Sequence, residues 1–201
     1  MNKFILASAS PRRSEILKNI GLDFEVVVSD ADENIENAEA ISADLYVQEL
    51  ALIKASASAK KILKMKNAVI IAADTIVTLD DNILGKPKDE EEAYLMLKAL
   101  SGRGHEVYTG ICVMRMSDGK SSCRSVKTEV VFKELTDEKI YDYIKTGEPM
   151  DKAGAYGIQG LGALLVKEIK GDYHNVVGLS LSALYDVLES EFDIDILKME
   201  D

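Results

Sequence analysis

A run of six apolar residues, 68–73, constrains the fold of this chain more than any other stretch. It reads AVIIAA and lies between Asn67 and Asp74, so it has the length of a strand and is too short for a buried helix. Strands that are apolar on both faces are typical of parallel sheets covered by helices on both sides. The run therefore predicts an α/β fold around a central buried strand.

Further strands and helices are expected on either side of this run. Apolar segments between turn residues predict the strands, and Asp118 with Gly119 predicts a hairpin turn. Capping residues such as Ser10, Asp89 and Thr136 predict where helices begin. The expected strands are 4–7, 24–28, 76–79, 107–116, 122–133 and 163–169, and the expected helices are 11–20, 42–63, 90–100, 137–145 and 175–188.

A loop of small residues, 8–10, precedes the first helix, which opens with a proline followed by Arg12 and Arg13. The exposed N–H groups and the dipole of a helix start favour an anion. Two cations are unfavourable there unless they bind an anion, and phosphate matches the planar guanidinium group. We therefore interpret Ser8 and the arginines as candidate phosphate ligands; the alternative is a solvated helix start with two surface arginines.

Asp74 follows the apolar run directly, at the position where the pattern predicts the strand to end. Ligands of open α/β sheets bind at the carboxyl ends of strands, and a buried unpaired carboxylate is costly. Asp74 is therefore a candidate metal ligand or proton acceptor. A second candidate metal ligand is Asp32 or Glu33 in the acidic loop 29–34, for which a solvated turn is the alternative.

Two lysines and a glutamine stand in unusual contexts. Lys54 lies within an apolar helical stretch, where its ammonium group either reaches water or contacts a phosphate. Lys86 lies between a glycine and a proline that fix its backbone. Segment 154–162 contains four glycines, a density that suggests backbone packed close to a ligand or to another strand. Within it, the Gln159 amide can both donate and accept, as reading the edge of a base requires.

Composition limits the class of protein. With 201 residues, 47% of them hydrophobic, the chain suits one compact domain or a domain of two lobes. A formal net charge of −11 argues against duplex nucleic acid and anionic membranes, but not against a small polyphosphate beside a local cationic cluster. No stretch resembles a membrane span or a signal peptide, so we expect a cytoplasmic protein. Cys112 and Cys123 flank the hairpin turn and are interpreted as reduced packing residues that could lie close together on paired strands.

Several motifs, taken together and in this order, resemble the Maf family of nucleoside triphosphate pyrophosphatases. They lie at residues 6–13 (LASASPRR), 73–75 (ADT), 85–87 (GKP), 151–160 (DKAGAYGIQG) and 175–179 (NVVGL), and the resemblance covers nearly the whole chain. It implies one Maf-like pyrophosphatase domain over residues 1–201. It also implies a mixed α/β fold (Maf/ITPase-like), in which an elongated twisted sheet is flanked by helices in two lobes, with the active-site cleft between the lobes.

The resemblance implies an activity as well: hydrolysis of a nucleoside triphosphate between its α- and β-phosphates, with Mg²⁺ or Mn²⁺, and with Asp74 as proton acceptor. Arg12, Thr75 and Gln159 match the branch that prefers dTTP and UTP, whereas members that act on 7-methyl-GTP carry other residues at these positions. The expected site therefore has catalytic Asp74, metal ligands Glu33 and Asp74, and substrate-binding Ser8, Arg12, Arg13, Lys54, Thr75, Lys86 and Gln159.

Other functions remain open at this point. One alternative is a non-enzymatic regulatory or binding protein linked to cell division, because the family takes its name from septum formation. Two enzymatic alternatives are a 7-methyl-GTP pyrophosphatase and a phosphatase that releases orthophosphate from the γ end. The expected partner is the nucleoside triphosphate, with neither nucleic acid nor membrane. Homodimers are common among relatives, although no residue here identifies an interface.

Overall fold

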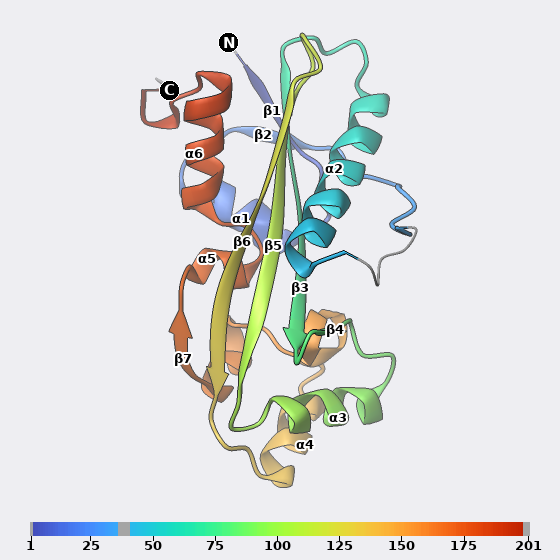
Figure 1. Cartoon of the computed structure of the whole chain (residues 1–201), viewed down its shortest axis with the longest axis vertical. Helices are drawn as coiled ribbons and strands as arrows, with labels where there is room; N and C mark the ends of the chain where they lie inside the picture. Colours follow the sequence, from blue (N-terminus) through green and yellow to red (C-terminus); the bar gives the residue numbers. More distant parts are fainter. Residues whose placement is uncertain (1, 36–40, 199–201) are drawn as a thin grey trace. The chain divides into compact units, whose positions relative to one another are not determined.

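The structure is a computed structural model that describes residues 2–35 and 41–198 (Figure 1). The chain divides into two compact units. Unit 1 comprises Met1–Asp74, Thr109–Val126 and Gly178–Asp201, and unit 2 comprises Thr75–Tyr108 and Lys127–Val177. The chain passes between the units at four points, three of which fall within strands.

The described strands form one mixed sheet of seven, in the order β2-β1-β3-β5-β6-β7, and β4 pairs with β3 beside this path. β1 pairs in parallel with both β2 and β3, whereas β4 is antiparallel to β3 and β7 is antiparallel to β6. The predicted mixed α/β fold is confirmed. The strands are β1 (Lys3–Leu6), β2 (Phe24–Val26), β3 (Ala68–Leu79), β4 (Asn82–Leu84), β5 (Gly104–Arg115), β6 (Ser121–Phe132) and β7 (Val166–Lys170).

Helices cover both faces of the strands in unit 1. Helix α2 (Ala43–Lys61) packs with alternate residues of β3 in one core cluster, and it lies close to β5. A Cβ atom on Gly110 of β5 would stand 2.0 Å from the carbonyl oxygen of Val47, so only glycine allows this approach. On the opposite face of β5, Arg115 contacts Phe192 at the end of α6 (Leu181–Phe192). The helix α1 (Pro11–Asn19) and the short η5 (Ile196–Lys198) complete unit 1.

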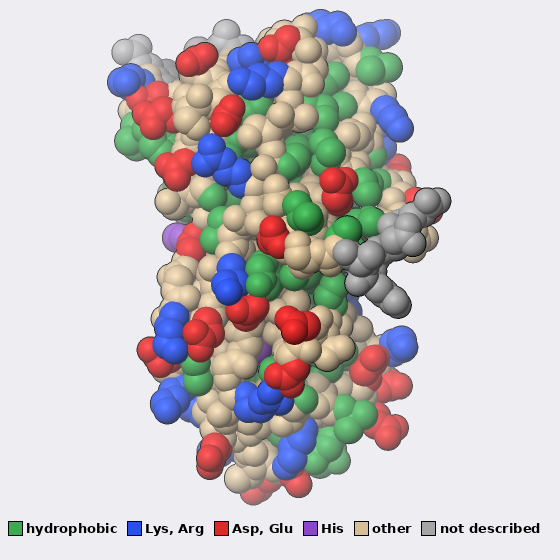
Figure 2. All heavy atoms as spheres, in the orientation of Figure 1, with side chains coloured by type: hydrophobic (Ala, Val, Ile, Leu, Met, Phe, Trp, Pro, Cys, Tyr) green, Lys and Arg blue, Asp and Glu red, His purple; other side chains and the backbone are tan. Residues whose placement is uncertain are grey.

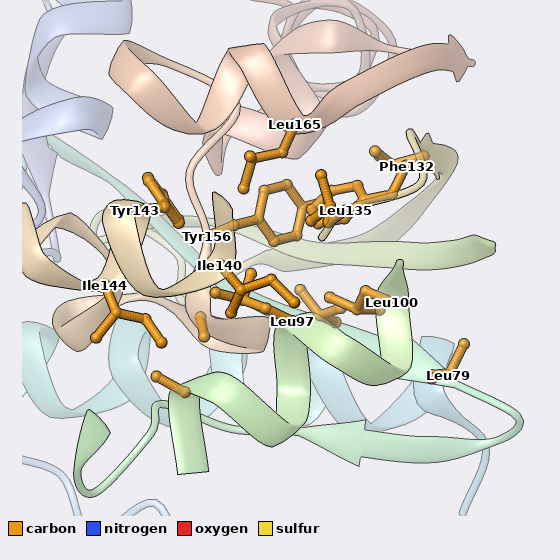
Figure 3. Close-up of a cluster of buried hydrophobic side chains, with 14 of the residues drawn as sticks. Leu79, Leu97, Leu100, Phe132, Leu135, Ile140, Tyr143, Ile144, Tyr156 and Leu165 are labelled. Carbon is orange, nitrogen blue, oxygen red and sulfur yellow. The ribbon is translucent and has the colours of Figure 1, made fainter. Parts of the chain in front are cut away.

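Unit 2 has a core of its own, drawn in Figure 3. Leu97 from α3 (Glu90–Leu100) and Ile140 from α4 (Asp137–Lys145) point toward each other, and Phe132 and Tyr156 pack beside them. Asp89 and Thr136 cap α3 and α4 as predicted. The remaining elements of unit 2 are η2 (Glu148–Asp151), η3 (Ala153–Ala155), η4 (Gly160–Leu165) and α5 (Tyr173–Val177).

Strand β3 corrects the prediction of two separate runs. The runs 68–73 and 76–79 belong to one strand of 12 residues, and Asp74 and Thr75 lie in its middle. Both residues are half-buried, whereas every other residue of β3 is buried. Pairing explains the continuity, because β1 supports β3 as far as Ile71 and β4 supports it from Val77 onward. Short β4, which the sequence pattern did not reveal, therefore extends the strand past its polar centre.

Three other boundaries differ from the prediction. The expected helix 175–188 is two helices, α5 and α6, because Gly178 has φ +128° and Ser180 accepts the N–H of Ala183 as the cap of α6. The expected strand 163–169 begins only at Val166, since the preceding residues form η4. Strand β2 ends at Val26 instead of residue 28. The hairpin of β5 and β6 agrees with its prediction to within three residues at each end.

Acidic and basic side chains are intermixed on the face of the molecule drawn in Figure 2. The net charge of −11 is therefore not concentrated into one acidic region on this face. Local electrostatics must be read from individual ion pairs, because screening limits exposed charges to about 8 Å at physiological salt.

Candidate functional site

The loop between β1 and α1 is held by the side chain of Arg13. This side chain is buried: its Nη1 donates to Ser8 Oγ at 3.1 Å, and its Nε donates to the carbonyl oxygen of Gly178 at 2.8 Å. Ser8 Oγ also accepts the N–H of Ser10 at 3.2 Å. Ser10 occupies the predicted N-cap position, although its own side chain makes no capping bond. The alternative of a surface arginine is therefore wrong for Arg13, and Arg12 beside it is half-buried.

Arg13 also lies within electrostatic reach of three other predicted site residues. Burial lowers the pKa of the Arg13 guanidinium; Asp74 opposes this shift, Arg12 adds to it, and Glu33 opposes it. Such influences weaken with distance and with screening by solvent. Arg13 is therefore within electrostatic range of Arg12, Glu33 and Asp74, all of which belong to unit 1.

Lys54 of α2 joins the two predicted metal ligands. Its Nζ forms an ion pair with Glu33 Oε2 at 3.2 Å and a second, shorter one with Asp74 Oδ1. The side chains of Lys54 and Asp74 are only 13% and 14% exposed, whereas that of Glu33 is 52% exposed. The Lys54 ammonium therefore does not reach out to water. It ties a carboxylate from the loop after β2 to a carboxylate from β3.

Asp74 lies past the carboxyl end of β1, not at the end of its own strand. Leu6 pairs with Ile71, and the N–H of Ala7 still donates to the oxygen of Ile71 at 2.8 Å. β1 then leaves the sheet at Ser8 while β3 continues through Asp74. The prediction that Asp74 ends its own strand is therefore wrong, because Asp74 lies within β3, beyond the carboxyl end of the neighbouring β1.

The carboxylate oxygens of Glu33 and Asp74 are suited to bind a divalent cation. Their oxygens converge on one positive group, the Lys54 ammonium. Mg²⁺ and Mn²⁺ prefer oxygen ligands, and Mg²⁺ is usually held by one or two carboxylates together with waters and substrate phosphates. Within residues 2–35 and 41–198, no three His, Cys, Asp or Glu side chains are grouped to hold a metal. A metal here would therefore need phosphate or water oxygens as further ligands.

The other three predicted residues belong to unit 2. Thr75 is half-buried on β3, Lys86 is exposed after β4, and Gln159 is half-buried at the N-cap position of η4. They come from the motifs at residues 73–75, 85–87 and 151–160. Contacts of the backbone at Gly154 connect these three motifs.

Gly154 makes this connection between the motifs. Its N–H donates to the oxygen of Gly85, next to Lys86, at 3.0 Å. A Cβ atom on Gly154 would stand 3.0 Å from Cγ1 of Val77, which shares a face of β3 with Thr75. Gly154 also has φ +67°, which favours glycine. The prediction that this segment packs its backbone closely against a strand is confirmed here.

Glu148, which was not among the predicted site residues, organises the glycine-rich segment. Its Oε1 accepts the Tyr143 hydroxyl and the N–H of Gly162, each at 2.9 Å, and its Oε2 accepts the N–H of Leu161 at 3.0 Å. Burial acts to raise the pKa of Glu148, but these hydrogen bonds outweigh it and lower the pKa. A carboxylate shortly before a run of glycines, whose N–H groups need acceptors, is the signal that identifies it.

His105 forms a second buried contact with this segment. Its Nε2 and the hydroxyl of Tyr156 are 2.7 Å apart, and both rings meet Phe132 edge to face. His105 is 2% exposed, and burial lowers its pKa to about 4. Its Nδ1 has no hydrogen-bond partner among the described residues. The imidazole is therefore held in its neutral form beneath the segment that carries Gln159.

A surface hollow of ≈ 700 Å³ lies in unit 1 between α2 and the loop that follows β2. Its lining includes Leu52, Lys60 and Lys61 on one side and Asp30 and Asp32 on the other. Lys61 and Asp30 form an exposed ion pair across it at 2.5 Å. None of the nine predicted site residues lines this hollow, so we assign the chemistry to the ion-pair cluster and not to it.

Among the described residues, no helix has both the length and the apolar character needed to cross a membrane. The family model described as "Maf-like protein" matches residues 3–191.

Curated relatives are similar over nearly their whole length. A protein of Thermoanaerobacter sp. (strain X514) is 51% identical over 195 residues, which cover 97% of this chain and 100% of the relative. One of Clostridium botulinum (strain Eklund 17B / Type B) is 54% identical, covering 93% and 98%. One of Acetivibrio thermocellus is 52% identical, covering 98% and 99%. Each is named dTTP/UTP pyrophosphatase. The motifs, the extent of the match and these relatives lead to one conclusion: the chain belongs to the Maf-like protein family.

Proposed function

We propose that this protein hydrolyses dTTP and UTP to the corresponding monophosphate and pyrophosphate. The observation that carries the proposal is the ion-pair cluster of Glu33, Lys54 and Asp74, near the buried Arg13 in unit 1. It combines carboxylates that can take a proton or a metal with cations that can meet phosphates. Relatives about half identical to this chain carry the name dTTP/UTP pyrophosphatase, which supports this substrate and this product.

Ser8, Arg13 and Lys54 would bind phosphate oxygens, with Arg12 beside them. An ammonium carries three N–H donors, and the two carboxylates account for two of those of Lys54 among the described contacts. The third can meet a phosphate oxygen. Lys86, which follows Gly85 on an exposed loop of unit 2, is the fourth proposed phosphate ligand, and its assignment depends on the family motif.

Asp74 would accept the proton of the attacking water. A bond forms between the water oxygen and the α-phosphorus, and the bond from that phosphorus to the oxygen bridging to the β-phosphate breaks. The proton passes to an Asp74 oxygen, and pyrophosphate leaves with the bridging oxygen. Positioning and electrostatic stabilisation carry most of the catalysis in such reactions. The ion pair with Lys54 orients the Asp74 carboxylate.

Glu33 and Asp74 would hold the divalent metal, Mg²⁺ or Mn²⁺. When bound, the metal supplies charge neutralisation for the triphosphate. The Lys54 ammonium bridges these two carboxylates, and its remaining N–H group would face a substrate phosphate beside the metal.

Thr75 and Gln159 would recognise the base, and Arg12 belongs to the same set of branch-specific residues. The Gln159 amide can donate to a pyrimidine carbonyl and accept from the N–H beside it. Gln159 is half-buried at the N-cap position of η4, and its side chain makes no capping bond there. These assignments depend on the family motifs and not on contacts to unit 1.

Residues 1–201 would act as one pyrophosphatase domain, since the family model extends across both units. We place the protein in the cytoplasm, acting on free nucleotides without nucleic acid or membrane as a partner. The net charge of −11 supports this. A homodimer is proposed from the family resemblance alone.

The test uses purified protein with Mg²⁺ or Mn²⁺ and a panel of dTTP, UTP, CTP, GTP and 7-methyl-GTP. Pyrophosphate and orthophosphate are quantified separately. Pyrophosphate released mainly from dTTP and UTP supports both the reaction and the branch. Turnover mainly of 7-methyl-GTP would contradict the roles of Arg12, Thr75 and Gln159. Orthophosphate as the primary product would contradict attack at the α-phosphorus, and no turnover by folded protein would favour a binding role.

A further inference from the structure

Cys112 and Cys123 face each other across the hairpin of β5 and β6 in unit 1. The N–H of Arg115 donates to the oxygen of Lys120 at 2.9 Å, which marks a hydrogen-bonded pair next to the turn. Counting back from this pair along both strands places Cys112 opposite Cys123, in a non-hydrogen-bonded pair. In such pairs the Cα atoms are about 4.5 Å apart, within the range of about 4.4–6.8 Å that a disulfide spans.

The two thiols touch but are not equivalent. Both are free cysteines, and a hydrogen bond joins their side chains. Cys112 is completely buried and packs with Ala51 and Ala55 of α2, whereas Cys123 is half-buried. Cys123 is therefore the more exposed of the two cysteines, and Cys112 lies opposite it on the neighbouring strand.

We propose that Cys112 and Cys123 form a hydroperoxide-reactive dithiol site, in which Cys123 is oxidised first and Cys112 then closes a reversible disulfide. Electrostatics agree with this order. The hydrogen bond from Cys112 lowers the pKa of Cys123, an effect that burial and the nearby Glu49 only partly oppose. The same contact and complete burial raise the pKa of Cys112. The thiolate is the reactive form, so the more exposed cysteine is also the more reactive one.

The chemistry balances with hydrogen peroxide, the simplest hydroperoxide, as the only added reactant. The Cys123 thiolate attacks one peroxide oxygen, the O–O bond breaks, and the leaving oxygen departs as water once protonated. Cys123 is then a sulfenic acid. The Cys112 sulfur attacks the Cys123 sulfur, the S–O bond breaks, and a second molecule of water leaves. The two cysteines have lost two electrons in total, and a small thiol reverses the reaction.

The site is independent of the proposed pyrophosphatase. None of the nine residues assigned to substrate or metal takes part, and the oxidation is read without nucleotide. Failure of either proposal leaves the other unaffected.

The experiment treats the folded protein with hydrogen peroxide and follows free thiols and intact mass. The chain has only two cysteines, so the readout is unambiguous. We expect loss of both thiols, a mass decrease of two hydrogen atoms without any intermolecular dimer, and full reversal by dithiothreitol.

Single variants test the order of the steps. Cys112→Ser should stop the reaction at a Cys123 sulfenic acid that a cyclic diketone reagent traps. Cys123→Ser should leave Cys112 unmodified at the same peroxide dose. Cys112→Ala replaces the first variant if a buried serine prevents folding.

Three results would overturn the proposal. They are survival of both thiols under peroxide, a gain of two oxygen atoms on Cys123 with no disulfide, and oxidation of Cys112 in the Cys123→Ser variant. The first two are measured on the wild-type protein and do not depend on whether a variant folds.

Discussion

Asp74 and Glu148 are two partly buried carboxylates, one in each unit, with very different partners. Among the described contacts, Asp74 is held by the ammonium of Lys54, which it shares with Glu33. Glu148 accepts a hydroxyl and two backbone N–H groups, donors whose positions the fold fixes. The first arrangement can exchange its partner for a substrate or a metal. Glu148 cannot exchange its partners without leaving backbone N–H groups of the glycine-rich segment without an acceptor.

This difference in partners distinguishes a carboxylate with a role in the reaction from one that stabilises the fold. A carboxylate that satisfies backbone donors stabilises a loop, because removing it leaves buried N–H groups without an acceptor. A carboxylate paired with a flexible side chain beside a second carboxylate is available for reaction. The two sites should therefore respond to mutation in opposite ways, one in turnover and the other in stability.

The largest effect is expected from Asp74→Asn. The amide keeps the shape of the side chain and can still accept from Lys54, but it cannot take a proton from water. We expect kcat for dTTP to fall about a thousandfold, within the usual range for a general base. The protein should remain folded in circular dichroism. The control is Asp142→Asn, which removes an exposed ion pair on α4 and should leave turnover unchanged. An Asp74→Asn enzyme with wild-type kcat would remove Asp74 from this role.

The next largest effect is expected on stability, from Glu148→Ala. The variant leaves the buried N–H of Gly162 and the hydroxyl of Tyr143 without their acceptor, so we expect a loss of roughly 4 kcal/mol in the free energy of unfolding. Urea denaturation measures it. Exposed Glu138→Ala on α4 is the control and should change stability by less than about 0.5 kcal/mol. If Glu148→Ala is as stable as the wild type, the contrast between the two carboxylates fails.

His105→Phe tests the core beneath the same segment through the pH dependence of stability. The unfolded histidine has a pKa of 6.5, and burial lowers the folded value to about 4. Between these pH values the unfolded state binds more protons, so the wild-type protein loses stability as the pH falls from 6.5 to about 4. That loss is on the order of 3 kcal/mol and ends below the folded pKa.

The phenylalanine variant should lack this contribution. It is expected to be less stable at neutral pH, because Tyr156 loses its partner, and to show a shallower fall in stability toward pH 4. Urea unfolding at several pH values measures both quantities. Parallel pH profiles for the two proteins would show that His105 does not titrate in this way.

The smallest effect is expected from Gln159→Glu. A carboxylate cannot donate to a pyrimidine carbonyl, so kcat/KM for dTTP and UTP should fall about tenfold with little change in stability. Gln48→Glu on α2 in unit 1 is the matched control and should not alter the preference between bases. Equal kcat/KM values for wild type and Gln159→Glu would argue against base recognition by Gln159.

Local patterns predicted most elements of this fold, and they failed at the centre of β3 and at the break between α5 and α6. The apolar run at 68–73, the hairpin and the caps at Asp89 and Thr136 are properties of neighbouring residues. The strand continues through Asp74 and pairs with β4 beyond it. In the sequence, polar Asp74 and Thr75 interrupt the apolar run and hide this continuation. The break at Gly178 was hidden because the apolar periodicity continues across it.

The candidate site shows the same division. Residue types and motifs identified the nine candidates, and the structure gathers six of them in unit 1 around two contacts. Lys54 meets Glu33 and Asp74 from α2, and Arg13 reaches Gly178, which lies 165 positions away. Neither contact can be read from spacing in the sequence. Glu148 was not predicted because it accepts backbone N–H groups, so the signal for it is its place before a run of glycines and not a pattern of side chains.

The most direct test of the central claim is hydrolysis of dTTP in water labelled with heavy oxygen, followed by mass spectrometry of the products. Attack at the α-phosphorus predicts that the label appears in thymidine monophosphate and that pyrophosphate stays unlabelled. Label in pyrophosphate would place the attack at the β-phosphorus, and label in orthophosphate would place it at the γ-phosphorus. Either of the latter results would contradict the role assigned to the Asp74 cluster.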